Sequence, residues 1–266
     1  MHPTNLRFAP SVLLLSLCAV PALLAQDNYE IQVYGSETVA KGKTMFETHT
    51  NYTISGTKTM ENGVYPSFHS WHETFEVTHG VSSWFEIGAY AFTAAGPEYS
   101  WQYVGSHLRP RVRVPEEWHW PVGVSLSTEI GYARPQFTED PWSMEVRPIV
   151  DKEIGPWYLS FNPTLDRSFH GKNAGCGVIF SPNAKVSYTI RKKVALGLEY
   201  YGSTGPLGNF DPLSEQQQQF MPSLDLNLGD NWEFNLGVGV GVTQGTDHLL
   251  VKMIIGRRFS FPWGAK

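Results

Sequence analysis

The chain has 266 residues and a formal net charge of −5, and 41% of its residues are hydrophobic. That length allows one large all-β domain or two ordinary domains. The acidic balance excludes nucleic acid as an expected partner, because binding to a phosphate backbone needs clustered lysine and arginine.

Residues 1–25 have the layout of a secretory signal peptide. Arg7 gives a weakly basic start, residues 12–24 are almost continuously apolar, and small residues stand at the expected cleavage site. The apolar run is too short to favour a transmembrane helix. We therefore expect Gln26 to be the first mature residue and residues 26–266 to form a single domain.

Removal of this peptide would change both the charge and the cysteine count. Loss of Arg7 leaves 19 basic against 25 acidic side chains, a formal charge of −6, and loss of Cys18 leaves Cys176 alone. We therefore expect no intrachain disulfide in the mature chain.

Segments in which apolar and polar residues alternate fill most of the mature chain. They lie at residues 44–54, 68–78, 84–93, 104–114, 121–132, 142–151, 157–166, 184–191, 194–201, 220–228, 232–242 and 249–259. A period of two indicates strands, and lengths near ten fit tilted strands that cross a hydrocarbon layer. Convincing amphipathic helices are absent from the sequence pattern, so the chain is predicted to be all-β.

The connections between these segments alternate in length. Short ones lie at 79–83, 115–120, 151–156, 191–193 and 229–231, and long ones lie at 55–67, 93–103, 133–141, 167–183 and 201–219. Only the last connection, 243–247, breaks the pattern by being brief. Short periplasmic turns and longer extracellular loops are typical of outer-membrane barrels. We predict an antiparallel transmembrane β-barrel of about twelve strands with both termini in the periplasm, and a soluble β-sandwich is the alternative.

The segment 232–242, WEFNLGVGVGV, shows how the two strand faces differ. A dinucleotide-binding loop is excluded, because the third glycine of its fingerprint would fall on Val242 and a turn follows in place of a helix. In a closed barrel the apolar alternates face lipid and the others fill the lumen. We expect Gly237, Gly239 and Gly241 to leave room for larger lumen side chains from neighbouring strands.

Tryptophans gather at both ends of the predicted strands. Those at short-turn ends are Trp84, Trp118, Trp120, Trp157 and Trp232, and those at long-loop ends are Trp101 and Trp142. Two aromatic belts at two membrane interfaces are typical of a transmembrane barrel. The placement favours the barrel over the soluble sandwich.

Four stretches resemble a known family. VYGSETVAKG (33–42), HETFEVTHGVSSWFEIGAY (72–90), RPRVRVPEEWHWPVGVSLSTEIGY (109–132) and GLEYYGSTGP (197–206) are similar to outer-membrane proteins grouped as the "MetA pathway of phenol degradation" family. The resemblance runs from about residue 30 to 259 and implies a transporter-like barrel that admits small or aromatic compounds. It carries over no functional residues. Barrels generally end in an aromatic residue that the assembly machinery recognises, whereas SFPWGAK follows the last predicted strand here.

The segment 104–114 carries a row of basic side chains on one face. Leu108, Val112 and Val114 are expected to face outward, which turns the alternating basic residues inward. Like charges on one face repel unless they are paired, and neighbouring strands offer carboxylates. The residues expected to line the pore are His107, Arg109, Arg111, Arg113, Glu86, Glu129, Glu145 and Arg147. They form either a charge-paired network that stiffens the barrel or a selectivity ladder for anionic or polar solutes, and the two readings are compatible.

Neither a metal site nor a cofactor is expected from the pattern. His69 and His72 are three apart on a predicted strand and point to opposite faces, so they cannot share an ion without a bulge. His49, His72 and His107 are all compatible with an inward position, but the sequence does not bring them together. Glu73 is expected to face outward, against the apolar pattern of its strand.

Nucleophile motifs are also absent from the sequence. GVSLS (123–127) has Ser127 where a nucleophile elbow needs glycine, and the outward Ser106 has no outward histidine nearby. We expect a non-enzymatic channel or uptake protein of the Gram-negative outer membrane. Its expected partners are outer-membrane lipids, small-molecule solutes and the barrel assembly machinery. A lipid-modifying barrel enzyme and a structural or surface-binding barrel remain the alternatives.

Overall fold

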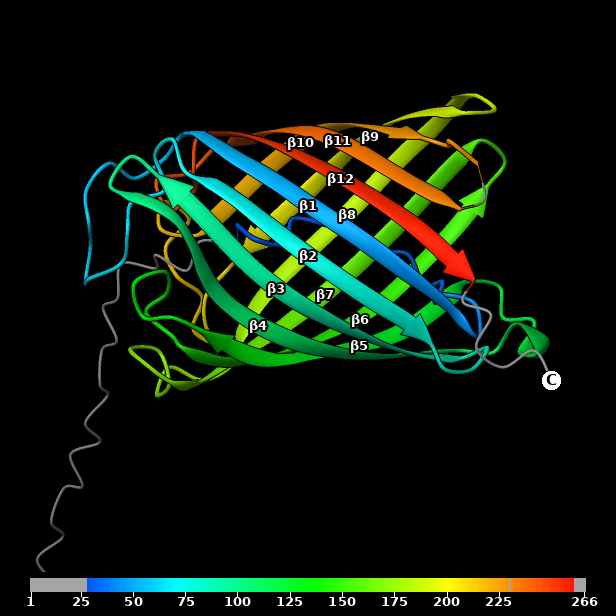
Figure 1. Cartoon of the computed structure of the whole chain (residues 1–266), viewed down its shortest axis with the longest axis horizontal. Coiled ribbons are helices and arrows are strands. Elements are labelled where there is room, and N and C mark those ends of the chain that lie inside the picture. Colours follow the sequence, from blue (N-terminus) through cyan, green and yellow to red (C-terminus); the bar gives the residue numbers. More distant parts are fainter. Residues whose placement is uncertain (1–27, 230, 261–266) are drawn as a thin grey trace, which may run out of the picture.

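A computed structural model describes residues 28–229 and 231–260 of the chain. The described residues form a closed antiparallel barrel of twelve strands, in which each strand pairs with its neighbours in sequence and β1 pairs with β12 (Figure 1). The predicted signal peptide, residues 1–25, lies outside the described residues, as do Asp230 and residues 261–266. Among the described residues no helix has the length and apolar character needed to cross a membrane.

All twelve predicted strands are confirmed, with shifted ends. The strands are β1 Lys43–Ser55, β2 Trp71–Gly80, β3 Phe85–Gly96, β4 Tyr99–Arg113, β5 Gly123–Ala133, β6 Trp142–Ile154, β7 Trp157–His170, β8 Ile179–Arg191, β9 Val194–Ser203, β10 Gln217–Leu226, β11 Trp232–Gly241 and β12 Leu249–Ser260. One 3-10 turn, Glu116–Trp118, lies in the connection between β4 and β5.

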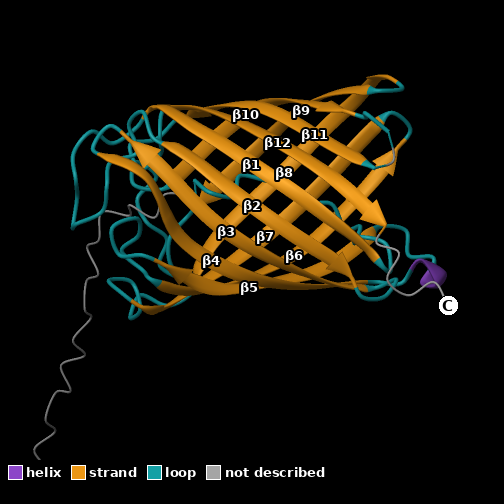
Figure 2. Cartoon of the chain, in the orientation of Figure 1, coloured by secondary structure: helices purple, strands orange, loops and turns teal. Residues whose placement is uncertain are grey.

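The connections lie at the two ends of the barrel, as Figure 2 shows. The short-turn end holds residues 81–84, 114–122, 155–156, 192–193, 227–229 and 231, and the long-loop end holds residues 56–70, 97–98, 134–141, 171–178, 204–216 and 242–248.

The predicted long loop at 93–103 is wrong. There β3 and β4 continue as a hairpin with paired residues Thr93–Tyr103 and Gly96–Tyr99, interrupted by two register shifts. The backbone ladder therefore extends beyond the alternating segment, because Thr93, Tyr99 and Trp101 favour strands and Ala94 is buried on the inner face. The loop predicted at 167–183 is likewise shorter, at 171–178, because β7 continues to His170 and β8 begins at Ile179.

The outer face of the barrel is apolar and its inner face is polar. In β5, Leu126 and Ile130 are 41% and 46% exposed, whereas Ser125, Ser127 and Glu129 are buried. A soluble protein has the opposite arrangement, so the soluble sandwich is excluded and the exposed band is a lipid-facing surface. The predicted interface tryptophans are likewise exposed.

We expect Leu126→Arg to destabilise the barrel by about 2–4 kcal/mol, because Leu126 lies on the lipid-facing surface near the middle of β5. The free energy of unfolding in lipid vesicles, followed by tryptophan fluorescence in urea, measures the effect. Leu126→Met is the control, since it keeps an apolar side chain there. Equal stability of the two variants would contradict the assignment of the lipid-facing surface.

The glycines of β11 are packed closely against lumen side chains. A Cβ added at Gly237 would lie 2.6 Å from Met221 Sδ, and one at Gly239 would lie 2.8 Å from Met221 Cε. Met221 belongs to the neighbouring strand β10, so the predicted spacing role is confirmed for Gly237 and Gly239. The same contacts show that this part of the lumen is filled. The predicted role is wrong for Gly241, where an added Cβ would clash with the Asp247 carbonyl oxygen of the loop that follows β11.

Residues 28–42, here called the lumen segment, run through the inside of the barrel before β1 begins (Figure 1). Asn28 donates a hydrogen bond to Asp247 at the long-loop end, and the segment meets β1 at Lys43 at the short-turn end. The prediction that both termini lie at the short-turn end is therefore wrong for the described chain. β12 ends there as predicted, but the first described residue lies at the opposite end.

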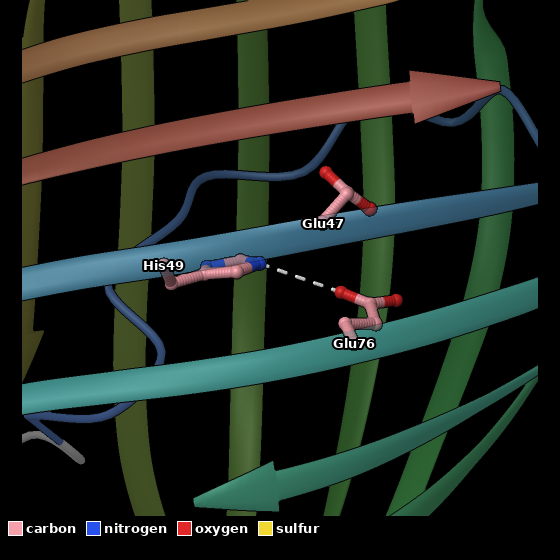
Figure 3. Close-up of side chains that lie close together, drawn as sticks. All are labelled: Glu47, His49 and Glu76. Atoms are coloured by element: carbon pink, nitrogen blue, oxygen red, sulfur yellow. Dashed lines mark ion pairs between the residues drawn. The ribbon is translucent and has the colours of Figure 1, made fainter. Parts of the chain in front are cut away.

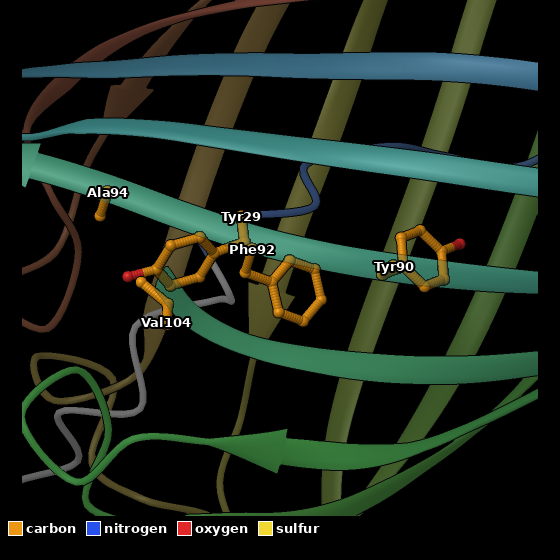
Figure 4. Packing of buried hydrophobic residues seen from close by; sticks show 5 residues of the cluster. All are labelled: Tyr29, Tyr90, Phe92, Ala94 and Val104. Atoms are coloured by element: carbon orange, nitrogen blue, oxygen red, sulfur yellow. The ribbon is translucent and has the colours of Figure 1, made fainter. Parts of the chain in front are cut away.

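Side chains of the lumen segment pack on opposite walls of the barrel. Tyr29 joins a buried cluster with Tyr90, Phe92, Ala94 and Val104 of β3 and β4 (Figure 4).

On the other wall, Ile31 and Val33 pack with Tyr201, Met221 and Leu250 of β9, β10 and β12. These two clusters form the apolar core, which therefore lies in the lumen and depends on the segment.

Candidate functional site

Lumen side chains hold the backbone of the lumen segment by hydrogen bonds. The Tyr34 backbone N–H donates to Asn162 Oδ1 at 2.8 Å, and Ser160 Oγ donates to the Tyr34 carbonyl at 2.6 Å. Thr74 Oγ1 donates to the Tyr29 carbonyl at 2.6 Å. Buried peptide groups need such partners, and an extended segment has none of its own.

The partners come from strands all around the barrel. Lys252 Nζ of β12 donates to the Ile31 carbonyl at 3.0 Å, and the Ser36 N–H donates to Asp151 of β6 at 2.7 Å. Each contact uses a polar side chain in place of a strand ladder. The segment is therefore bound as an extended peptide in a polar channel.

Arg109 and Arg111 form the centre of a buried charge network. Arg109 pairs with Glu76 and, at 3.0 Å, with Glu86. Arg111 Nε lies 2.7 Å from Glu86 Oε1, and the same guanidinium donates to the carbonyls of Gly35 and Glu37 of the lumen segment. The predicted pairing of Glu86 with this basic row is confirmed, and the network also binds the segment.

The other predicted lumen residues lie in three further places. His107 pairs with Glu129 on the next strand. Arg113 lies 3.0 Å from Glu116 at the short-turn end, where Glu116 is 77% exposed.

Glu145 and Arg147 pair with each other on β6 at 2.6 Å. Arg147 also approaches Glu30 of the lumen segment at 3.9 Å and lies over the Tyr34 ring. The predicted set is therefore split along the lumen into four groups, one at the short-turn mouth and three in the interior. Whether these groups select ions remains a prediction.

A second buried charge cluster was not among the predicted residues. Lys252 Nζ lies 2.5 Å from Glu199 Oε2 and 2.9 Å from the Tyr201 hydroxyl, and Lys252 and Glu199 are each 1% exposed. Lys185 contacts the other Glu199 oxygen at 3.2 Å. The inward position of Lys252 follows from the alternation of β12, but its partners on β9 depend on the closure of the barrel.

Two cavities lie in the lumen beside the segment. One of about 940 Å³ opens at the short-turn end and is bordered by residues 32–40 of the lumen segment. The other, of about 440 Å³, lies at the long-loop end beside Tyr29 and Tyr99. Gln32 borders both cavities, so the segment separates them.

Asp247 fastens the start of the lumen segment at the long-loop end. It accepts hydrogen bonds from Asn28, Thr53 and Ser67. Burial raises the pKa of the Asp247 carboxyl, and these hydrogen bonds partly oppose the rise.

Glu73 and Ser106 lie on the outer face of the barrel, and each has a polar partner. Glu73 lies on the outer face as predicted and accepts a hydrogen bond from Thr50 at 2.7 Å, which gives this carboxylate a partner. The Ser106 hydroxyl lies 2.8 Å from the Tyr103 hydroxyl. That contact is with a phenol and gives the enzymatic alternative no support.

No family model matches the chain, and no curated protein sequence matches it. Solved structures do match. The NanC porin has a TM-score of 0.53 at 8% identity, covering 81% of this chain and 100% of that one. The KdgM porin in complex with disordered oligogalacturonate has a TM-score of 0.47 at 10% identity, covering 82% and 99%. The translocator domain of the autotransporter NalP from Neisseria meningitidis has a TM-score of 0.43 at 10% identity, covering 84% and 90%.

At such identities only the fold is comparable, and it is that of outer-membrane barrels. The resemblance to the "MetA pathway of phenol degradation" family remains a prediction.

Proposed function

We propose that this protein is an outer-membrane channel for small solutes, closed by its own lumen segment. The observation that carries the proposal is the pair of cavities that the segment separates, at about 940 and 440 Å³. A barrel of about eight strands is filled by its own side chains, whereas one of about 16 leaves an aqueous channel. A barrel of twelve strands lies between these sizes. The presence or absence of the lumen segment therefore determines whether a path through the barrel is open.

The contacts that bind the lumen segment support the proposal that it can leave the lumen. Its backbone is held by side chains such as Asn162, Ser160 and Thr74, and water can replace each of these partners. The strand ladder from β1 to β12 does not include the segment. Its departure would therefore leave the barrel closed on itself and the lumen hydrated.

The solute class is part of the proposal. Both cavities are lined by charged residues, and the cavity at the long-loop end also has Tyr29, Tyr65, Phe92, Tyr99 and Phe137 on its wall. Aromatic rings stack on such side chains. Small polar compounds that carry an aromatic ring fit this wall, and the family resemblance points to the same class.

A disulfide lock tests the proposal. A Cβ at Gly123 would lie 3.2 Å from Ser36 Cβ, and disulfides need about 3.5–4.5 Å between these atoms. A small backbone shift gives that separation, and the Asp151 carboxylate, which would clash with the added Cβ, must turn aside. We would replace Ser36 and Gly123 by cysteine in a Cys176→Ser background and follow solute uptake by liposome swelling. Uptake should stop on oxidation and return on reduction, while the Cys176→Ser parent should respond to neither treatment. If the reduced variant and a variant without the segment both exclude all solutes, the channel proposal is wrong.

Arg109, Arg111 and Arg113 are expected to set the ion preference once the segment has left. Arg111 would then lose its acceptors at Gly35 and Glu37 and face the open path. Arginine keeps its charge at physiological pH. In planar bilayers under a salt gradient, replacing all three by glutamine should shift the reversal potential of the open pore toward cations.

The control for this prediction is Arg257→Gln. Arg257 lies over the Trp232 and Phe259 rings and is exposed, so its removal changes the charge outside the lumen. An unchanged reversal potential in a conducting triple variant would leave the three arginines with a structural role only.

A further inference from the structure

Three potential metal ligands meet on the inner wall of the barrel beneath the larger cavity. Glu47 and His49 lie two residues apart on β1 and therefore share its inner face, and Glu76 of β2 is directly opposite Glu47 in the register. One ligand atom from each residue lies within 4.8 Å of the other two (Figure 3). Glu47 is 6% exposed, and His49 and Glu76 are fully buried.

The protein satisfies this group only in part. His49 Nε2 and Glu76 Oε2 form an ion pair at 3.4 Å, whereas Glu47 Oε1 and His49 Nδ1 are buried and have no hydrogen-bond partner. Arg109 pairs with the other oxygen of Glu76 and with Glu86, and Glu47 has no ion pair among the described residues. Two buried carboxylates on directly opposed residues repel each other, and unpaired buried charge is costly. A cation between them would remove both costs.

We propose that Glu47, His49 and Glu76 bind a divalent first-row transition metal ion such as Zn²⁺. Imidazole nitrogen and carboxylate oxygen are ligands that these ions accept. Zinc bonds of about 2.1 Å in a tetrahedral site place ligand atoms about 3.4 Å apart. His49 Nε2 and Glu76 Oε2 are already 3.4 Å apart, so rotation of the Glu47 side chain completes the set.

The ion can reach the site from the short-turn end. Glu47 lines the larger cavity, together with Met45 and Thr78. Three protein ligands leave one position of a tetrahedral ion for water or another small ligand, which would face this cavity. The site is built from β1 and β2 alone and does not depend on the channel proposal.

Matched substitutions of two buried histidines test the proposal. His49→Gln removes a ligand, whereas His72→Gln removes the other inward histidine near it, which packs edge-on against Tyr29. Both variants would be refolded, stripped with a chelator and titrated with Zn²⁺ by isothermal calorimetry. Wild type and His72→Gln should bind one tight ion per barrel, and His49→Gln should bind it more than an order of magnitude more weakly.

A spectroscopic readout separates this site from exposed histidines. Co²⁺ in place of Zn²⁺ should give the strong visible absorption of a four-coordinate ion in wild type, and Glu47→Gln should lose it. Glu47→Gln is nearly isosteric, so it keeps the test valid if His49→Gln does not fold. Absence of a tight ion in the wild-type barrel would overturn the proposal, as would an undiminished tight site in folded His49→Gln.

Discussion

Deletion of residues 28–40 should convert the barrel into a constantly open pore with a single-channel conductance several times that of the wild type. The deleted residues separate the two cavities, which would join into one path along the axis. Strand β1 begins at Lys43, so all twelve strand pairings are retained. The side chains that lose a partner, such as Asn162 and Arg111, would face water in the open lumen and would not be left unsatisfied.

The same deletion should lower the thermal stability of the barrel. It removes Tyr29, Ile31 and Val33 from the two apolar clusters and so exposes the apolar surface that they cover. Planar-bilayer recordings measure the conductance, and the unfolding temperature in detergent measures the stability. Deletion of residues 58–63 in the loop between β1 and β2 is a control, because these residues are exposed and their loss leaves Tyr65 and the segment in place. A conductance equal to that of the wild type would show that the segment does not close the path.

The strands could be predicted because the residues of each strand alternate between the lipid-facing surface and the lumen. In β5, every inward position is polar or small and every outward position is apolar or β-branched, so period and length define the element without knowledge of its neighbours. Nearest-neighbour pairs follow from the same information. Glu86 and Arg111 belong to adjacent strands of one hairpin, and their pairing was therefore expected from the sequence.

Contacts across the lumen could not be predicted in this way. The lumen segment has alternating residues, such as Ile31 and Val33, but it forms no ladder with a neighbouring strand. Its partners lie up to 221 positions away, as with Lys252 and the Ile31 carbonyl. Such contacts depend on the register summed around the closed barrel, and one shifted residue turns a side chain to the other face.

The metal-ligand group of Glu47, His49 and Glu76 could not be predicted from the sequence either. The alternation of β1 places His49 on the inner face, and the same pattern allows an inward position for His72 and His107. The actual neighbours of His49 are two glutamates, one of which, Glu47, lies on the same strand. The register of β1 against β2 decides that Glu76 completes the group.

Lys252→Met should cost about 3 kcal/mol of unfolding free energy, the lower end of the range for removing one partner of a buried ion pair. Lys252 and Glu199 are each 1% exposed, so the carboxylate that remains has little access to water. Lys185 stays 3.2 Å from Glu199, which keeps the cost from being higher. Urea unfolding in lipid vesicles measures the loss.

The same substitution should raise the open probability of the channel. Lys252 donates to the Ile31 carbonyl, so its loss leaves that buried peptide group unsatisfied and weakens the hold on the lumen segment. Lys185→Met is the matched control, because Lys185 also pairs with Glu199 but has no hydrogen bond to the segment among the described contacts. It should lower stability without opening the channel. If both variants open the channel equally, the opening follows from general destabilisation of the barrel, and the bond from Lys252 to the segment has no special role in closure.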